Sequence, residues 1–205
     1  MFKKILVVII ALFTVSVASA KTLLIVGDSI SAGYGIDISK GWVKLLEQRL
    51  KDERYDYEVI NASVSGDVTS NGVVRLPALL EKYRPAIVII EMGGNDGLRA
   101  TPPKIIQQNL SQMVQQAKQQ SKVLLVGIQL PPNYGELYLE RFNAMYPAVA
   151  NEQQVALLDS IVKNTGGSVD LMQSDGIHPN DKGQHIILDD IWEKLVPLLG
   201  QPNKS

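Results

Sequence analysis

The 205-residue sequence contains no cysteine, and its only histidines are His178 and His185. Without cysteine the chain cannot form disulfides or use a thiol nucleophile, and with two histidines a zinc site is nearly excluded. No segment shows the Asp, Asn and Gly spacing of a calcium-binding loop. We therefore expect a protein without a metal site, and the chemistry described below requires no organic cofactor.

The chain also lacks an excess of charge of either sign and has no run of basic residues. It carries 20 Lys and Arg against 21 Asp and Glu, a formal net charge of −1. Nucleic acids are bound through clusters of Lys and Arg that neutralise phosphates, so we expect no nucleic-acid partner. The composition, 45% hydrophobic and 20% charged, is that of a globular chain whose length fits one domain.

The longest hydrophobic run lies at the N-terminus. Lys3 and Lys4 precede an apolar stretch over residues 5–17, and small residues follow up to Ala20. This layout predicts a secretory signal peptide over 1–20, cleaved before Lys21, with one domain over 21–205. As a helix the apolar stretch would reach only about 20 Å, short of a bilayer core of about 30 Å. We therefore expect a periplasmic or secreted protein without a stable membrane span.

In the rest of the chain, short apolar runs alternate with longer amphipathic segments. The runs that predict strands are 22–26, 58–60, 86–90, 123–126 and 155–158. The segments that predict helices are 42–51, 71–83, one opening at Pro102-Pro103, 138–151 and one capped by Asn180 or Asp181. Pro77 should kink or break the second of them. Strands joined by helices of this length indicate an α/β fold: a parallel sheet with helices on both faces.

Polar side chains follow the first predicted strand directly. Ser29 lies in the segment Gly27-Asp28-Ser29-Ile30-Ser31, which places its hydroxyl at the carboxyl end of the strand. Ligands bind at this edge of parallel α/β sheets. The alternative is a serine that only caps a helix or forms a turn. The segment lacks the G-x-S-x-G pattern of other α/β-hydrolases, because Ser31 occupies the fifth position.

A candidate base stands just before the last predicted helix. Asp175 precedes His178 by three residues, a spacing that lets its carboxylate accept the Nδ1 proton and leaves Nε2 free to act as a base. Pro179 biases His178 toward an extended conformation. The alternative is a turn aspartate and an exposed histidine without a role. His185 lies within the predicted helix, where we expect it on the surface.

Candidate donors for an oxyanion follow two further strands. Gly66, in the segment 61–67, lets a backbone N–H approach a ligand closely, and Asn95, in 93–97, offers side-chain N–H groups. Each segment alone is more simply a turn. Together with Ser29, His178 and Asp175 they complete a nucleophile, a base, its orienting group and the oxyanion donors on one predicted edge of the sheet.

These segments resemble the SGNH (GDSL-type) hydrolases, whose four letters fall here on Ser29, Gly66, Asn95 and His178. The resemblance spans roughly 22–199 and is closest to the branch that contains periplasmic acyl thioesterases, lysophospholipases and arylesterases. It implies a compact α/β/α three-layer fold with a five-stranded parallel sheet, of flavodoxin-like architecture. It also implies an oxyanion hole made by the Ser29 amide, the Gly66 amide and the Asn95 side chain. The proline-rich segment 100–103 departs from the thioesterase branch, so chain-length preference cannot be carried over.

The sequence thus predicts a serine esterase or thioesterase that forms an acyl-enzyme on Ser29, with a small-molecule acyl ester or lipid as its partner and a monomeric state. Leu98 and Tyr134 are candidate substrate-binding residues. Ile128, Leu130 and Pro131 lie near the same strand ends and could line the acyl site or simply pack in the core. Two alternatives remain: a carbohydrate O-acetyl esterase or acetyltransferase, and a non-catalytic ligand-binding protein on the same fold.

Overall fold

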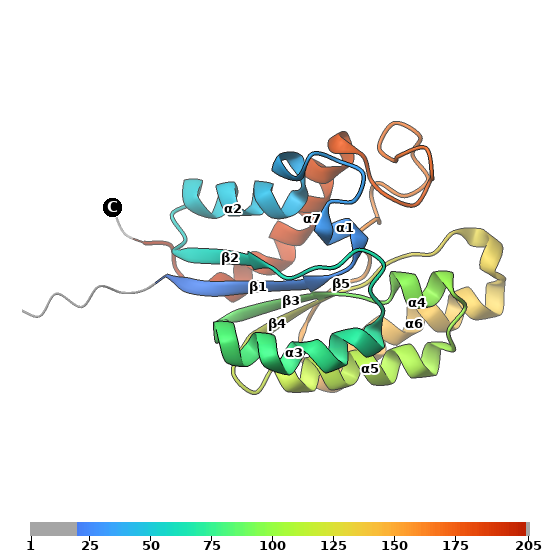
Figure 1. Ribbon diagram of the computed structural model, residues 1–205, viewed down its shortest axis with the longest axis horizontal. Coiled ribbons are helices and arrows are strands. Elements are labelled where there is room, and N and C mark those ends of the chain that lie inside the picture. Colours follow the sequence, from blue (N-terminus) through green and yellow to red (C-terminus); the bar gives the residue numbers. More distant parts are fainter. Residues whose placement is uncertain (1–19, 204–205) are drawn as a thin grey trace, which may run out of the picture.

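The computed structural model describes residues 20–203, so the predicted signal peptide, apart from Ala20, lies outside the described residues. Five parallel strands form one sheet in the order β2-β1-β3-β4-β5, which confirms the predicted fold (Figure 1). The strands are β1 (Lys21–Gly27), β2 (Tyr57–Asn61), β3 (Ile87–Glu91), β4 (Lys122–Val126) and β5 (Ala156–Leu158).

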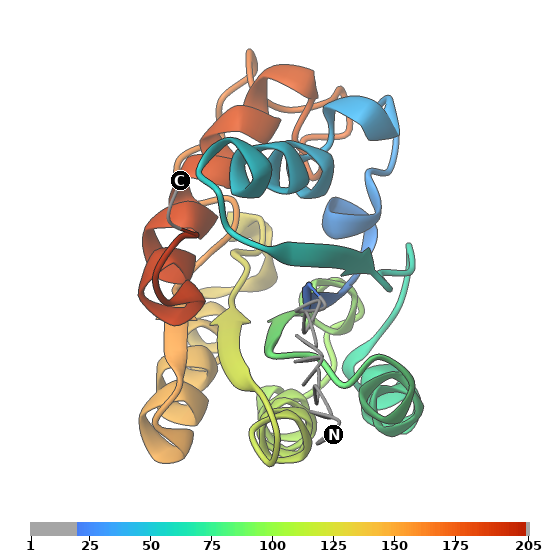
Figure 2. The ribbon, with the colours of Figure 1, turned by 90° about the vertical axis from the view of Figure 1, so that its left-hand side faces the viewer.

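Helices cover both faces of the sheet. On one face lie α2 and α7, and on the other lie α3, α5 and α6, as the view along the strands shows (Figure 2). The α-helices are α1 (Ser29–Ala32), α2 (Trp42–Asp52), α3 (Thr69–Tyr83), α4 (Gly94–Leu98), α5 (Pro103–Ala117), α6 (Glu136–Gln153) and α7 (Asp181–Leu199). Two short 3₁₀ turns, η1 (Ile38–Lys40) and η2 (Pro132–Tyr134), complete the elements. In residues 20–203 no helix is both long and apolar enough to cross a membrane.

The central strands are apolar on both sides because helices pack on both faces. The β1 side chains from Leu23 to Val26 and the whole of β3 are buried. This burial explains the continuous apolar runs in the sequence, because a strand covered on both faces has no side that must be polar. Burial of these runs and of the apolar helix stripes supplies the main stabilisation of the fold.

Helices α2, α5 and α7 begin where the sequence predicts, whereas α3 and α6 begin two residues earlier, at Thr69 and Glu136. Pro103 opens α5, where its missing N–H would have no partner in any case. Asn180 caps α7 by accepting hydrogen bonds from the N–H groups of Lys182 and Gly183. The expected break at Pro77 does not occur. Helix α3 runs through this residue without interruption, and Pro77 is exposed on the helix surface.

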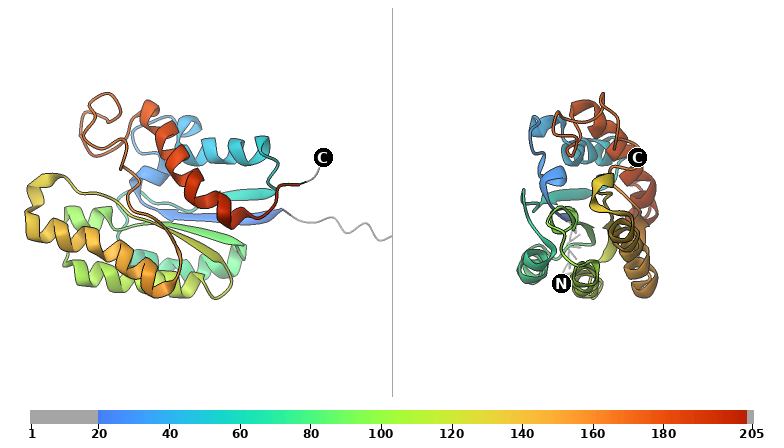
Figure 3. Two further views of the ribbon diagram at one scale, coloured as in Figure 1. Left: turned by 180° about the vertical axis from the view of Figure 1, so that it is seen from behind. Right: turned by 90° about the vertical axis from the view of Figure 1, so that its right-hand side faces the viewer.

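The strand register brings the predicted functional segments to one edge of the sheet. Gly27 at the end of β1 lies opposite Glu91 at the end of β3, and Ile25 lies opposite Asn61 at the end of β2. The segments that follow these three strands therefore leave the sheet side by side. In Figure 1 this edge is on the right, and the right-hand panel of Figure 3 looks onto it. In the strand order 2-1-3-4-5 the switch point lies between β1 and β3, where open α/β sheets bind ligands.

Candidate active site

Ser29, His178 and Asp175 form a continuous hydrogen-bonded chain. The Ser29 Oγ lies 2.9 Å from His178 Nε2, and His178 Nδ1 lies 2.7 Å from the Asp175 Oδ2. Ser29 is the first residue of α1, whereas the other two residues come from the loop before α7, 149 positions away for His178. The structure therefore brings together the three residues that the sequence singled out as nucleophile, base and orienting carboxylate.

The Asp175 carboxylate is held as an ionised acceptor. Its partial burial alone would raise its pKa, but hydrogen bonds from the N–H of His178, the His178 ring and the N–H of Ile177 lower that pKa below the ordinary value. An ionised carboxylate can only accept, so the neutral imidazole carries its proton on Nδ1 and has a lone pair on Nε2. Nε2 faces Ser29 and can take its hydroxyl proton.

The turn that carries Ser29 leaves no room for a side chain at Gly27. A Cβ there would lie 2.7 Å from both the Glu91 Oε2 and the Ser31 Oγ. Asp28 follows and caps α1, its Oδ1 accepting from the N–H of Ile30 at 3.2 Å. Only Asp28 therefore separates the end of β1 from α1, and Ser29 lies at the first position of that helix.

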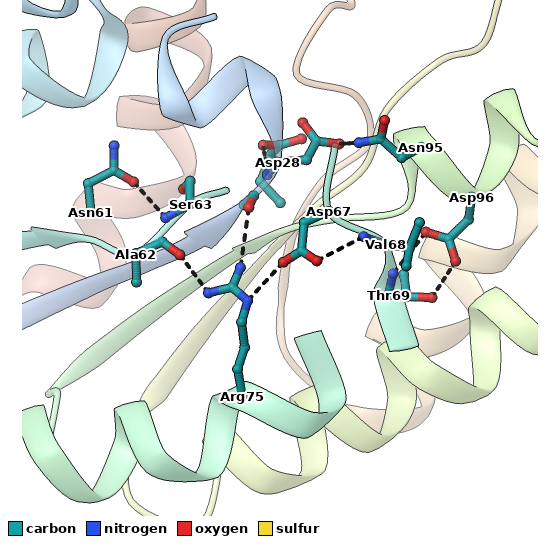
Figure 4. A network of polar contacts seen from close by, with 12 residues as sticks. Asp28, Asn61, Ala62, Ser63, Asp67, Val68, Thr69, Arg75, Asn95 and Asp96 are labelled. Carbon is teal, nitrogen blue, oxygen red and sulfur yellow. Dashed lines mark hydrogen bonds and ion pairs between the residues drawn. The ribbon is translucent and has the colours of Figure 1, made fainter. Parts of the chain in front are cut away.

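The sequence predicts three oxyanion donors: the Ser29 N–H, the Gly66 N–H and the Asn95 side chain. Within the described residues neither the N–H of Ser29 nor that of Gly66 donates a hydrogen bond to the protein. Gly66 adopts a φ of +80°, a backbone conformation that glycine reaches without strain. Asn95 lies on α4 with its Nδ2 3.3 Å from the Asp28 Oδ2 (Figure 4). Free N–H groups of this kind can stabilise a developing negative charge.

One partly buried ion pair and several hydrogen bonds hold in place the loop that carries Gly66 and the helix that carries Asn95. Arg75 of α3 pairs with Asp67 at 2.8 Å and also donates to the carbonyl groups of Ala62 and Gly27, so it ties the loop after β2 to the end of β1 (Figure 4). Asp96 accepts from the Thr69 N–H at 2.9 Å and from its hydroxyl at 2.6 Å. These contacts join the loop that carries Gly66 to the helix that carries Asn95.

An apolar cavity of about 300 Å³ adjoins these residues. Leu98 lines it, as do Ile128, Leu130 and Pro131, the residues for which core packing was the alternative. Tyr134 is not among the lining residues; its hydroxyl donates to the carbonyl group of Leu98 at 3.0 Å. The remaining lining residues are Gly94, Gln129, Pro132, Val162, Gly166, Gly167, Met172, Gly176 and Ile177.

His185 is exposed on α7, as expected. Across residues 20–203 no group of three or more His, Cys, Asp or Glu side chains is arranged to hold a metal ion. The groups that the structure brings together at the site are a hydroxyl, an imidazole, carboxylates and an amide.

Residues 25–186 match the model of the GDSL-like lipase/acylhydrolase family. The chain belongs to this family. Its membership confirms the resemblance drawn from the sequence and the expectation of an enzyme that hydrolyses acyl compounds.

Members of the family resemble the chain over nearly its whole length. It is 54% identical over 183 residues to esterase TesA of Pseudomonas aeruginosa, a match that covers 89% of this chain and 91% of that protein. It is 43% identical over 191 residues to thioesterase 1/protease 1/lysophospholipase L1 of Escherichia coli, covering 93% of this chain and 90% of that protein. The crystal structure of the psychrotrophic esterase EstA from Pseudoalteromonas sp., inhibited by monoethylphosphonate, superimposes with a TM-score of 0.83 at 38% identity, covering 88% of this chain and 100% of that one.

Two buried carboxyl groups beside Ser29 were missed by the sequence reasoning. Asp28 is 2% exposed and Glu91 is 1% exposed. The Glu91 Oε2 accepts from the N–H of Asp28 at 3.3 Å and from the Ser31 hydroxyl at 2.7 Å. The signal for Glu91 was present, because it directly follows the apolar run 86–90 in a strand buried on both faces. Acidic residues at such positions are rare unless they have a partner.

Proposed function

We propose that the protein hydrolyses carboxylic esters and thioesters by two-step acyl transfer through Ser29. The observation that carries this proposal is the chain of contacts from Asp175 through His178 to the Ser29 hydroxyl, at 2.7 and 2.9 Å. A nucleophile, a base within hydrogen-bond reach and an orienting group are the components of covalent acyl transfer.

In the first step the Ser29 oxygen bonds to the carbonyl carbon of the substrate while His178 Nε2 takes the hydroxyl proton. The carbonyl oxygen becomes an oxyanion that the N–H groups of Ser29, Gly66 and Asn95 stabilise. Asp175 keeps the imidazole in its reactive tautomer and stabilises the imidazolium. His178 then gives its proton to the departing alcohol or thiol as the bond to the acyl carbon breaks. In the second step His178 takes a proton from water as the water oxygen bonds to the acyl carbon. His178 then returns this proton to the Ser29 oxygen as the bond between that oxygen and the acyl carbon breaks, which releases the acid.

The apolar cavity supports substrates whose acyl group is longer than acetyl. Apolar side chains such as Leu98, Ile128 and Leu130 line a space that a hydrocarbon chain can occupy with removal of its surface from water. We include aryl and alkyl esters, acyl thioesters and lysophospholipids in this class. Similarity to esterase TesA and to thioesterase 1/protease 1/lysophospholipase L1 supports the same range.

We also propose that the enzyme is exported and acts as a monomer of residues 21–205. The basic, apolar and small-residue regions over 1–20 support export through a cleaved signal peptide. When the full chain is expressed in a secreting bacterial host, the N-terminus of the exported product should be Lys21. An export fraction that retains Met1, or a product confined to the cytoplasm, would contradict this part of the proposal.

A fluorophosphonate probe tests the catalytic assignment. It should label wild-type protein at Ser29, whereas Ser29→Ala and His178→Ala should remain unlabelled. His185→Ala serves as the matched control and should be labelled at the wild-type rate, because this histidine is exposed on α7. Absence of labelling in wild-type protein would instead favour a non-catalytic ligand-binding protein.

Hydrolysis of p-nitrophenyl esters from acetyl to palmitoyl, with a lysophospholipid and an acyl-CoA alongside, tests the substrate class. Leu98→Trp should fill part of the cavity and reduce kcat/KM for long acyl chains more than for acetyl. Leu137→Trp is the control, because Leu137 is exposed on α6. Activity confined to acetylated sugars would favour the carbohydrate O-acetyl esterase. An equal effect of Leu98→Trp on all chain lengths would show that the cavity does not bind the acyl chain.

A further inference from the structure

The Asn95 side chain can serve the oxyanion in only one of its two orientations. A carboxamide has a carbonyl oxygen at one end and an NH₂ group at the other, and rotation by half a turn exchanges two groups of nearly the same size. With NH₂ toward the site, Asn95 donates to a developing negative charge. With the oxygen there, the same side chain repels that charge.

Asp28 distinguishes these two orientations. Its Oδ2 lies 3.3 Å from the Asn95 Nδ2, and the close-up shows the amide nitrogen turned toward that carboxylate (Figure 4). An ionised carboxylate accepts hydrogen bonds and cannot donate, so it can bind the NH₂ end of Asn95 and repels the oxygen end. One of the two N–H bonds is used in this contact, and the other is left for a ligand.

The carboxylate itself cannot turn away. The Asp28 Oδ1 accepts from the N–H of Ile30 at 3.2 Å, and the backbone N–H of Asp28 donates to the buried Glu91 Oε2. Gly94, one position before Asn95, closes the remaining side, because even a Cβ there would approach the Asp28 Oδ2 to 3.0 Å. At 2% exposure no solvent competes for the two oxygens.

Asp28 carries its charge at neutral pH. Burial raises its pKa to about 6; the hydrogen bond from the Ile30 N–H and the neighbouring His178 lower it, and Asp67 and Asp96 raise it. The adjacent Glu91 is fully buried, and this burial raises its pKa well above its usual range.

We propose that Asp28 is a positioning residue that orients the Asn95 amide, so that an N–H and not the carbonyl oxygen faces the oxyanion. This inference rests on the proposed function and adds a residue that acts through Asn95 without touching the substrate.

Asp28→Asn is the decisive variant, because it has the same shape but only one acceptor oxygen. When that oxygen keeps the hydrogen bond to the Ile30 N–H, the new NH₂ group faces Asn95. Asn95 then turns its own oxygen toward residue 28 to accept, and its NH₂ group leaves the position from which it served the oxyanion. The variant should keep its fold and lose the donor.

We expect Asp28→Asn to lower kcat on p-nitrophenyl butyrate by about 10²–10³-fold, the effect of deleting one oxyanion donor. KM should stay within about twofold, because only the transition state needs the donor. The melting temperature at pH 7 should equal or exceed that of wild type. Adding Asn95→Ala to Asp28→Asn should cause no further loss, since both changes remove the same donor.

Two other variants separate orientation from capping. Asp37→Asn changes an aspartate whose Oδ1 caps η1 through the Ser39 N–H, far from Asn95 in the chain, and should leave kcat unchanged. Asp28→Ser should still cap Ile30 but is too short to bind Asn95. Its kcat should fall between wild type and Asp28→Asn, because the amide is then free and not inverted.

The inference is overturned if Asp28→Asn keeps a kcat within about threefold of wild type while Asn95→Ala is impaired. It is also overturned if the losses of Asp28→Asn and Asn95→Ala multiply in the double variant, or if the loss in kcat comes with a lower melting temperature in both Asp28 variants. The proposed function fails separately, and this inference with it, if wild type hydrolyses no ester or if Asn95→Ala is fully active.

Discussion

The free energy of unfolding should respond to Asp28→Asn in a way that depends on pH. The pKa of Asp28 rises from 3.8 to about 6 on folding, mainly because the carboxyl group is buried. Between these two values the folded state holds a proton that the unfolded state has lost, so stability from this group is complete below pH 3.8 and is lost as the pH rises through 6. A shift of about two pKa units corresponds to roughly 3 kcal/mol of unfolding free energy. Solvent does not screen this contribution, because Asp28 is only 2% exposed.

Asparagine at this position has no such dependence. The difference in unfolding free energy between Asp28→Asn and wild type should therefore move in favour of the variant as the pH rises. Roughly 2 kcal/mol of the change should fall between pH 4.5 and 7.5, because the unfolded aspartate is already mostly ionised at the lower limit. A variant that is more stable yet less active at neutral pH is the expected signature of a charge kept for function.

Urea denaturation of both proteins at several pH values between 4.5 and 7.5 measures this difference. Asp37→Asn is the control, because the pKa of the exposed Asp37 is lowered from 3.8 by hydrogen bonds from Ser39, so this group is ionised in both states throughout the range. Its difference from wild type should be flat. A flat curve for Asp28→Asn, or one that moves in favour of wild type with rising pH, would refute the reasoning.

Two further predictions concern the residues that hold the site. Asp175→Asn keeps an oxygen for the backbone N–H groups of the loop but presents NH₂ to the Nδ1 of His178, which selects the wrong tautomer of the imidazole. In steady-state kinetics kcat should fall by a factor on the order of 10⁴ with little change in KM. A loss below tenfold would argue against this role. Arg75→Met removes the partner of Asp67, which is 5% exposed, so unfolding in urea should show a loss of about 3–5 kcal/mol. Lys194→Met, which breaks an exposed ion pair with Glu193, should change the unfolding free energy far less, because solvent screens this pair, and similar losses in the two variants would contradict the assigned importance of burial.

The element types and their order followed from local patterns. The runs 22–26 and 86–90 predicted central strands because a strand buried on both faces has no polar side, and β1 and β3 extend only one residue beyond them at the carboxyl end. Asn180 and Pro103 marked helix starts through their own hydrogen-bonding chemistry. The short helices α1 and α4 gave no periodic signal, because four or five residues complete barely more than one turn.

Sequence order alone also indicated which segments would meet, since the carboxyl ends of parallel strands share one edge. It determined which of the candidate residues are available there: Ser29, His178 with Asp175 three positions earlier, Gly66 and Asn95. Their distances depend on the sheet register and on the loop before α7, which closes a gap of 149 positions between His178 and Ser29. Only the tertiary structure decided that Asp28 and Glu91 are buried side by side and that Asp28 faces Asn95. The local run before Glu91 signals only that this residue is buried. Its partners come from segments distant in the chain, so no local pattern could identify them.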